Sequence, residues 1–163
     1  MSDPQLAIHI REAVPADAEI IIEFNRRLAA DTEDKALDPQ RLADGVRHAL
    51  SSTDTCLYLV AEVGGRVVGQ TMVTFEWSDW RNGWFWWIQN VFVLPDFRRR
   101  GIFRALHDRV RTLARAKGNT CGIRLYVEHE NHTAQQTYRG LGMVPSGHLV
   151  FEEDWSADDS PGK

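Results

Sequence analysis

The feature that most constrains the fold is a strand, a helix and a second strand that follow one another along the chain. Residues 84–94 (WFWWIQNVFVL) are rich in aromatic and β-branched side chains, which indicates a strand. Apolar residues recur at helical spacing through 101–117, and residues 122–128 alternate as in a strand. Such a connection is right-handed and makes its two strands parallel, so these residues predict a β-α-β crossover.

The rest of the chain predicts antiparallel strands and further helices. Gly64 and Gly65 separate two strand-like runs, a pattern typical of a two-residue hairpin. The predicted order β-α-α-β-β-β-α-β-α-β indicates an α+β fold, with four helices on a mixed, mostly antiparallel sheet. The elements are a strand at 6–12, a helix from Pro15, a helix capped by Asp38, strands at 56–63, 67–77 and 84–94, a helix at 101–117, a strand at 122–128, a helix capped by Asn131 and a final strand at 147–154.

Length, charge and hydropathy exclude several classes of protein. The chain has 163 residues and a formal net charge of −4, which makes it a poor general binder of nucleic acid. Residues 1–153 are expected to form a single domain, and 154–163 a disordered acidic tail. No apolar run approaches the ~18 residues of a membrane span, and no signal peptide begins the chain, so a cytoplasmic protein is expected. Cys56 and Cys121 lack metal-ligand spacing and are predicted to be buried free thiols.

Four arginines crowd the start of the helix at 101–117: Arg98, Arg99, Arg100 and Arg104. A helix N-terminus has a partial charge of about +0.5, so cations there are unfavourable. A bound anion would offset this repulsion, because both the free N–H groups and the arginine side chains would bind it. The cluster therefore predicts an anion site, the alternative being a solvated charged surface.

These residues resemble the acetyl-CoA motif of the GNAT superfamily of N-acetyltransferases, Gln/Arg-x-x-Gly-x-Gly/Ala after a short strand. In VFVLPDFRRRGIFRAL, Arg98 takes the first position, Gly101 is the central glycine and Phe103 replaces the last Gly/Ala. A second segment, NHTAQQTYRGLGM, is similar to the family pattern Asn-x-x-Ala-x-x-x-Tyr-x-x-x-Gly-Phe, with Asn131 and Tyr138 in register. The resemblance extends over nearly the whole domain.

This resemblance implies that acetyl-CoA is the cosubstrate, with no metal. Backbone groups of the strand would pair with the pantetheine arm, and amides at the helix start would hold the pyrophosphate. Tyr138 would protonate the departing CoA thiolate, although a core aromatic would have the same spacing. The implied cofactor residues are Val91, Phe92, Val93, Arg98, Arg99, Arg100, Gly101, Ile102, Phe103, Arg104, Asn131 and Tyr138.

A general base for the acceptor amine is harder to assign. Some branches of the family have a carboxylate on the strand before the arginines, where this chain has Gln89 and Asn90. An amide can orient a substrate or a water but has no useful basicity near neutral pH. The remaining candidates are Glu76 and Glu128 on neighbouring strands, with His129 nearby, or a chain of water molecules without a dedicated base.

Aromatic and acidic residues suggest what the acceptor is. Most of the tryptophans at 77–87 are expected to pack in the sheet, while Trp77 and Trp80 could line a pocket, bind a cation or cover a dimer interface. Asp31, Glu33 and Asp34 lie in a predicted acidic loop at 31–36, which borders the acceptor site in this family. We therefore expect a small-molecule or peptide amine, with a cationic acceptor as a weaker hypothesis.

The sequence predicts an N-acetyltransferase that works by direct transfer in a ternary complex, since neither cysteine is placed to accept an acetyl group. A CoA-binding sensor without catalysis is the first alternative, because the strand lacks a carboxylate. A nucleic-acid-binding domain that uses the arginines and tryptophans is a more remote one. A homodimer is expected from the resemblance alone.

Overall fold

The computed structural model describes residues 7–33 and 36–156. The chain divides into two compact units, one ending at Tyr126 and the other beginning at Val127, and each is described by itself below. The predictions for Asp34, for residue 6 and for the end of the tail lie outside the described residues. The single domain predicted over 1–153 stays a prediction.

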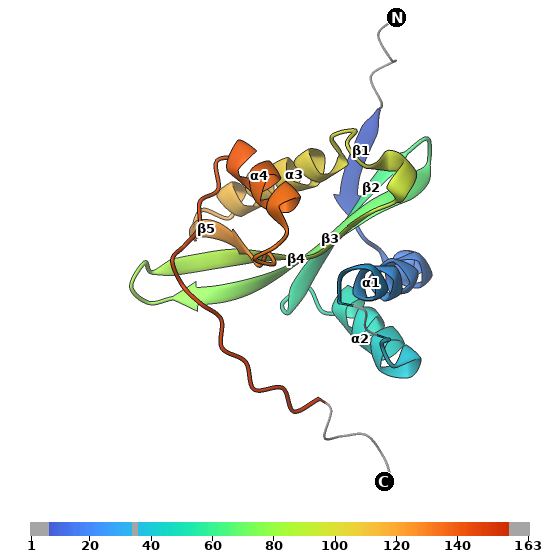
Figure 1. Cartoon of the computed structure of the whole chain (residues 1–163), viewed down its shortest axis with the longest axis horizontal. Helices are drawn as coiled ribbons and strands as arrows, with labels where there is room; N and C mark the ends of the chain where they lie inside the picture. The colour runs from blue at the N-terminus through green and yellow to red at the C-terminus, as the bar shows by residue number, and fades with distance from the viewer. Residues whose placement is uncertain (1–6, 34–35, 157–163) are drawn as a thin grey trace, which may run out of the picture. The chain divides into compact units, whose positions relative to one another are not determined.

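The first unit is built on a five-stranded sheet whose strands lie side by side in chain order (Figure 1). Neighbouring strands are antiparallel except for the last pair, which is parallel and is joined by the predicted crossover helix. The predicted fold class and the crossover are therefore confirmed. The strands are β1 (Ile8–Glu12), β2 (Cys56–Val63), β3 (Arg66–Ser78), β4 (Gly83–Val93) and β5 (Thr120–Leu125).

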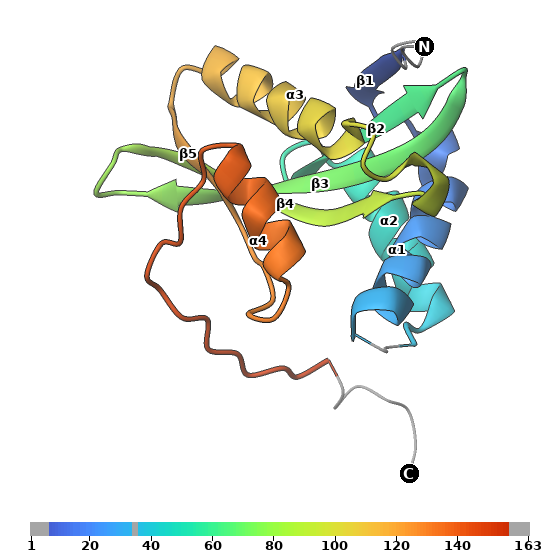
Figure 2. The same ribbon diagram turned by 45° about the horizontal axis from the view of Figure 1, so that its top comes forward.

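Helices cover both faces of this sheet, as Figure 2 shows for α3 on one side and α1 with α2 on the other. The alternation of β2 explains the arrangement, because successive side chains of a strand point to opposite faces. Leu59 packs in a core cluster with Leu106 of α3, whereas Tyr58 and Val60 pack with Val46 of α2. The helices are α1 (Ala18–Glu33), α2 (Pro39–Ser51) and α3 (Ile102–Ala116).

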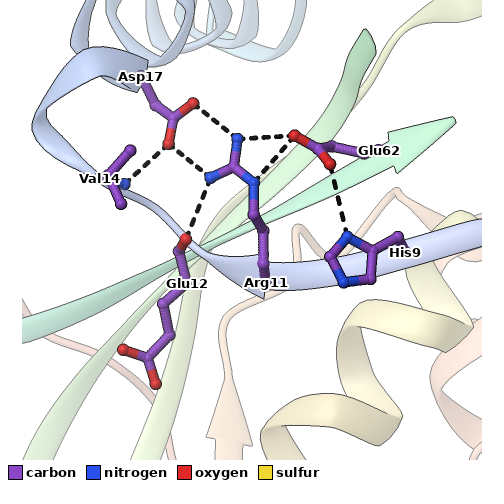
Figure 3. A network of polar contacts seen from close by, with 6 residues as sticks. All are labelled: His9, Arg11, Glu12, Val14, Asp17 and Glu62. Carbon is purple, nitrogen blue, oxygen red and sulfur yellow. Dashed lines mark hydrogen bonds and ion pairs between the residues drawn. The ribbon is translucent and has the colours of Figure 1, made fainter. Parts of the chain in front are cut away.

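An ion-pair network ties the first strand to the start of α1 (Figure 3). The guanidinium of Arg11 makes two hydrogen bonds to the Asp17 carboxylate, at 2.8 and 3.0 Å, and binds Glu62 on β2. Asp17 also accepts the Val14 N–H at 2.8 Å, which fixes the turn that leads into the helix. Hydrogen bonding to Arg11 holds the pKa of the Asp17 and Glu62 carboxyls below their usual values. This network is structural and binds β1, β2 and the helix start together.

The second unit contains one helix, α4 (His132–Gly140), within its described residues. The predicted cap is confirmed, since the Asn131 side chain accepts the Ala134 N–H at 3.0 Å. The predicted final strand at 147–154 is wrong, because this stretch has no regular secondary structure. Its apolar side chains suggest a strand, but a strand needs a neighbour for its backbone groups, and none of the described strands pairs with it. Phe151 is consequently 91% exposed.

Three smaller predictions also need correction. The acidic loop expected at 31–36 begins later, since α1 continues to Glu33 and includes Asp31. The strand expected at 122–128 ends at Leu125. Cys56 is buried as predicted, but Cys121 is exposed, because strand alternation turns it away from the core. No helix in the described ranges is long and apolar enough to cross a membrane.

Candidate functional site

A β-bulge interrupts β4 toward its C-terminal end, between Gln89 and Phe92. Gln70 lies opposite Phe92 and Met72 lies opposite Gln89, so β4 has one more residue than β3 between these two pairs. The extra residue distorts the strand, and Asn90 has a φ of 51°. This is the left-handed region, which Asn tolerates better than most residues. The two amides expected at the site, Gln89 and Asn90, therefore lie at the bulge.

Side chains of β3 bind the carbonyl groups of the bulge. Thr71 Oγ1 donates to the Gln89 carbonyl at 3.0 Å, and Gln70 Nε2 donates to the Asn90 carbonyl at 3.3 Å. Both donors are buried, with 1% and 0% of their surface exposed. A buried carbonyl without a partner would cost about 1–3 kcal/mol, so these two bonds stabilise the bulge.

Beyond the bulge, one edge of β4 is open. β5 pairs with β4 only from Trp84 to Ile88, and within the described residues no strand pairs with the edge of 89–93 on that side. The Leu94 N–H donates to Val68 of β3, so alternation directs the backbone groups of Val91 and Val93 to the open edge. The Val93 carbonyl accepts a hydrogen bond from the Arg98 side chain, but no strand pairs with these groups, and such an edge can bind an extended ligand as an additional strand would.

The start of α3 follows β4 closely, and its first N–H groups lie outside the pattern of helical hydrogen bonds. Gly101 is the N-terminal cap of α3 and has a φ of 83°. No side-chain hydrogen bond caps this end of the helix. The first helical bond is from Ala105 to the Gly101 carbonyl, so the N–H groups of Ile102, Phe103 and Arg104 make no bond within the helix. A Cβ added at Gly101 would meet nothing within 4 Å, so the positive φ, and not crowding, favours glycine here.

The predicted arginines lie around this helix start. Arg98 Nε donates to the Val93 carbonyl at 3.0 Å, and its guanidinium lies over the Phe92 ring. Arg100 lies over the ring of Phe97, and Arg99 has a φ of 63°. The structure thus brings the open edge of β4, the N-terminal amides of α3 and the arginines into one region of the first unit, which suits an anionic ligand with an extended arm.

Glu76 is not brought to the bulge. It lies opposite Phe85, about 16 Å along β4 from Asn90 at the usual rise per residue. Its carboxylate accepts hydrogen bonds from Trp87 Nε1 and from Arg124, both at 3.0 Å. This carboxylate is therefore engaged in a local ion pair and is poorly placed to take a proton at the bulge.

Glu128, His129, Asn131 and Tyr138 all lie in the second unit. The backbone carbonyls of Glu128 and His129 accept hydrogen bonds from Gln135, which fixes the turn before α4. Tyr138 is half-buried on α4, and burial raises the pKa of its phenol. A raised pKa keeps the phenol protonated, as a proton donor requires.

A cavity of about 300 Å³ opens between α2 and the sheet, at the bulge. Its walls are mostly apolar, and its polar groups are few, as is usual for small-molecule sites. Asn90 was expected from the sequence to be in a site, whereas Asn25, Asp38 and Tyr58 were not. The residues that line it are Asn25, Leu37, Asp38, Arg41, Leu42, Gly45, Val46, Ala49, Tyr58, Met72 and Asn90.

Three polar residues of the cavity lining form one hydrogen-bond network with Gln70 of β3, named here the amide network (Asn25, Tyr58, Gln70, Asn90). Tyr58 Oη accepts from Asn25 Nδ2 at 3.1 Å and from Asn90 Nδ2 at 3.2 Å. Gln70 Nε2 donates to Asn25 Oδ1 at 2.7 Å. A polar Asn25 among the apolar residues of α1, and Gln70 within an apolar strand, were the sequence signals that could have revealed this network.

Comparison with known proteins adds a family to this geometry. Residues 21–143 match the model of the acetyltransferase (GNAT) family. Among curated proteins, a thialysine N-epsilon-acetyltransferase from Bos taurus is 30% identical over 159 residues, which cover 91% of this chain and 89% of that protein.

Solved structures with a similar fold include two clostridial proteins. A possible acetyltransferase from Clostridium difficile 630 has a TM-score of 0.83 and 43% identity, over 90% of this chain and 97% of that chain. A predicted acetyltransferase from Clostridium acetobutylicum, solved with acetyl-CoA, has a TM-score of 0.74 and 17% identity, over 94% of this chain and 100% of that one.

Proposed function

Because the chain belongs to the acetyltransferase (GNAT) family, we propose that it transfers an acetyl group from acetyl-CoA to a primary amine by direct transfer in a ternary complex. The observation that carries this proposal is the open edge of β4 beside the N-terminal amides of α3. One region then offers backbone groups for an extended arm and positive charge for a diphosphate.

Acetyl-CoA would bind along this region. Backbone groups of Val91 and Val93 would pair with the pantetheine arm, and the amides from Arg99 to Arg104 would hold the pyrophosphate. Gly101 leaves space for the phosphates beside the backbone. The fold relative from Clostridium acetobutylicum was solved with acetyl-CoA, which supports this choice of cofactor. The described residues contain no group of side chains that could hold a metal ion.

The acceptor amine would enter the cavity between α2 and the sheet. Asn90 belongs both to the cavity and to the strand proposed to hold the cofactor, so an amine in the cavity would meet the thioester at the bulge. Leu42, Val46 and Met72 would contact an apolar stem. The relative from Bos taurus is named for the acetylation of thialysine, a molecule with a side-chain amine, which is consistent with an amine acceptor.

The reaction needs a neutral amine, because a protonated nitrogen has no lone pair. The nitrogen would form a bond to the acetyl carbon, the bond from that carbon to sulfur would break, and CoA would leave with a proton from Tyr138. The proton lost by the nitrogen would pass to water, and Tyr138 would regain one from solvent. Asp38 is the one carboxylate among the described residues that line the cavity, and its Oδ1 accepts the Arg41 N–H, so water is the more direct proton acceptor.

A CoA-binding protein without catalysis is the alternative that one observation favours. The bulge, where related enzymes can have a carboxylate, has the neutral side chains of Gln89 and Asn90, and Gln89 donates to Thr74 at 2.6 Å. Such a protein would bind acetyl-CoA but acetylate no amine.

A binding measurement followed by an activity measurement tests the proposal. Acetyl-CoA at about 100 times its dissociation constant should stabilise the fold by about 2.7 kcal/mol in thermal unfolding. Acetylation should then be measured against a panel of primary amines. Absence of stabilisation would contradict both functions, and stabilisation without turnover on any amine would favour the non-catalytic protein.

The role of Tyr138 has its own matched pair of variants. Tyr138→Phe should lower kcat by about 100-fold or more while the dissociation constant of acetyl-CoA changes little. Tyr126→Phe is the control, since Tyr126 is 58% exposed and stacks on Trp87 away from the cavity lining. Equal losses of kcat and of acetyl-CoA binding in Tyr138→Phe would contradict the role as proton donor.

A further inference from the structure

The hydroxyl of Tyr58 has an unusual set of partners. Its ring is buried, with 4% of its surface exposed, and its oxygen accepts hydrogen bonds from the side-chain amides of Asn25 and Asn90. A phenol oxygen has two lone pairs and one hydrogen. Both lone pairs are therefore used, and its hydrogen is donated to none of the described residues in the hydrogen bonds that the structure shows.

The direction of the hydrogen bond from Asn25 follows from the backbone of the bulge. The Asn90 carbonyl can only accept, so the side-chain atom of Gln70 that faces it must be the nitrogen. The same nitrogen lies 2.7 Å from Asn25, so the Asn25 atom that faces Gln70 must be oxygen. The Asn25 nitrogen is then turned to Tyr58, and it donates to the phenol oxygen.

The free hydrogen of Tyr58 is directed to the cavity by elimination. Asn25, Tyr58 and Asn90 all line it, and the two amides occupy the acceptor positions of the phenol. Burial raises the pKa of Tyr58, so the phenol is neutral and keeps this hydrogen. A ligand group that meets Tyr58 must therefore accept a hydrogen bond, and an ammonium group cannot.

We infer that Tyr58 is a specificity residue of the cavity, which donates its hydroxyl hydrogen to an oxygen of the acceptor molecule close to the reacting amine. This inference rests on the proposed function. The oxygen must be close to the amine because Tyr58 is bonded to Asn90, the cavity residue on β4, where transfer is proposed. The nitrogen lone pair is not the partner, since a hydrogen bond to it would block its attack on the thioester. The acceptor class is thus an amine with a hydroxyl, ether or carbonyl oxygen within a few bonds.

Two amines that differ by one oxygen test this inference. trans-2-Aminocyclohexanol and cyclohexylamine should be compared as substrates of the wild-type chain and of Tyr58→Phe. The variant should lower kcat/KM for the amino alcohol by about 10–100-fold and for cyclohexylamine by less than about threefold. Comparing each amine with itself in the two proteins removes the difference in amine basicity. Equal losses for both amines, or no loss for either, would overturn the inference.

A measurement of amine binding separates this inference from the proposed function. Calorimetry should be run with the protein saturated with CoA. Tyr58→Phe should raise the dissociation constant of the amino alcohol about 10-fold or more and that of cyclohexylamine little. This measurement needs no turnover, so it tests Tyr58 even if no amine is acetylated, which would contradict the proposed function alone. Tyr126→Phe is the matched control, and thermal unfolding of all three proteins reports whether the variants fold. An equal change of affinity for the two amines would overturn the role of Tyr58.

Discussion

Two polar networks, one joining α1 and the other the turn before α1 to the sheet, use different chemistry. The amide network connects Asn25 of α1 to β2, β3 and the bulge without any charged group. The network at β1 consists of Arg11, Asp17 and Glu62, with Arg11 bound to both carboxylates. Three residues of the first network (Asn25, Tyr58, Asn90) line the cavity, and the second network lies at β1, at the edge of the sheet (Figure 3).

The molecule thus has charged groups at β1 and neutral hydrogen-bonding groups at the bulge. Charges join β1, β2 and the turn before α1, and none of the charged residues lines the cavity. Neutral amides hold the bulge, where a fixed direction of hydrogen bonding leaves one donor for a ligand. The direction of these hydrogen bonds does not change with pH near neutrality, because none of the amides can ionise.

The largest expected effect comes from breaking the amide network at its centre. Gln70→Met keeps the length of the side chain but removes the donor to the Asn90 carbonyl and to Asn25. The carbonyl is left without a partner, so unfolding free energy should fall by about 1–3 kcal/mol. A bulge displaced by about 1 Å should lower kcat/KM for the amine about 100-fold. Unchanged kcat/KM in a destabilised variant would show that the network is only structural.

Breaking the charged network should separate stability from activity. Asp17→Asn removes the negative charge that Arg11 binds, and urea unfolding at neutral pH should show a loss of about 1–3 kcal/mol. The pKa of Asp17 is lowered below 3.8, so its contribution is present above that value and is lost as pH falls through the folded pKa. The difference between variant and wild type should therefore shrink in acid, while kcat/KM stays within about twofold at neutral pH. A difference that persists in strong acid would contradict the ion-pair explanation.

The smallest expected effect is at the far end of β4. Arg124→Met removes the ion pair with Glu76, which is 48% exposed at its side chain, so stability should fall by less than about 1 kcal/mol. Activity should not change, because Glu76 lies far from the bulge. A changed pH profile of kcat/KM would indicate instead that Glu76 takes part in proton transfer.

Local patterns in the sequence predicted much of the fold. Gly64 and Gly65 form the expected turn, with φ values of 58° and 77°, and Asn131 caps α4. The helix at 101–117 and its parallel crossover were also predictable, because periodicity and the handedness of crossovers are local rules. The strand at 147–154 failed for the opposite reason, since its existence depends on a partner and not on its own residues.

The candidate site was predictable only where its residues are close together in the sequence. Gly101 and the arginines around it were predicted in this way, and their role in binding a cofactor stays a prediction. The bulge at Asn90 was not, because a register shift depends on the pairing of two strands. The cavity was not, because Tyr58 and Asn25 are 33 residues apart and meet only in the folded unit. A homodimer and a cytoplasmic location stay predictions.

The central claim is that the start of α3 binds acetyl-CoA through its backbone, and two glycines at opposite ends of that helix test it. Gly101 and Gly118 both have a positive φ, 83° and 76°, so replacing either by Ala should cost about 1–2 kcal/mol of stability. Calorimetry should show that Gly101→Ala raises the dissociation constant of acetyl-CoA about 10-fold or more, because the amides no longer hold the pyrophosphate. Gly118→Ala should change this dissociation constant by less than about twofold. Equal dissociation constants for the two variants would contradict the account.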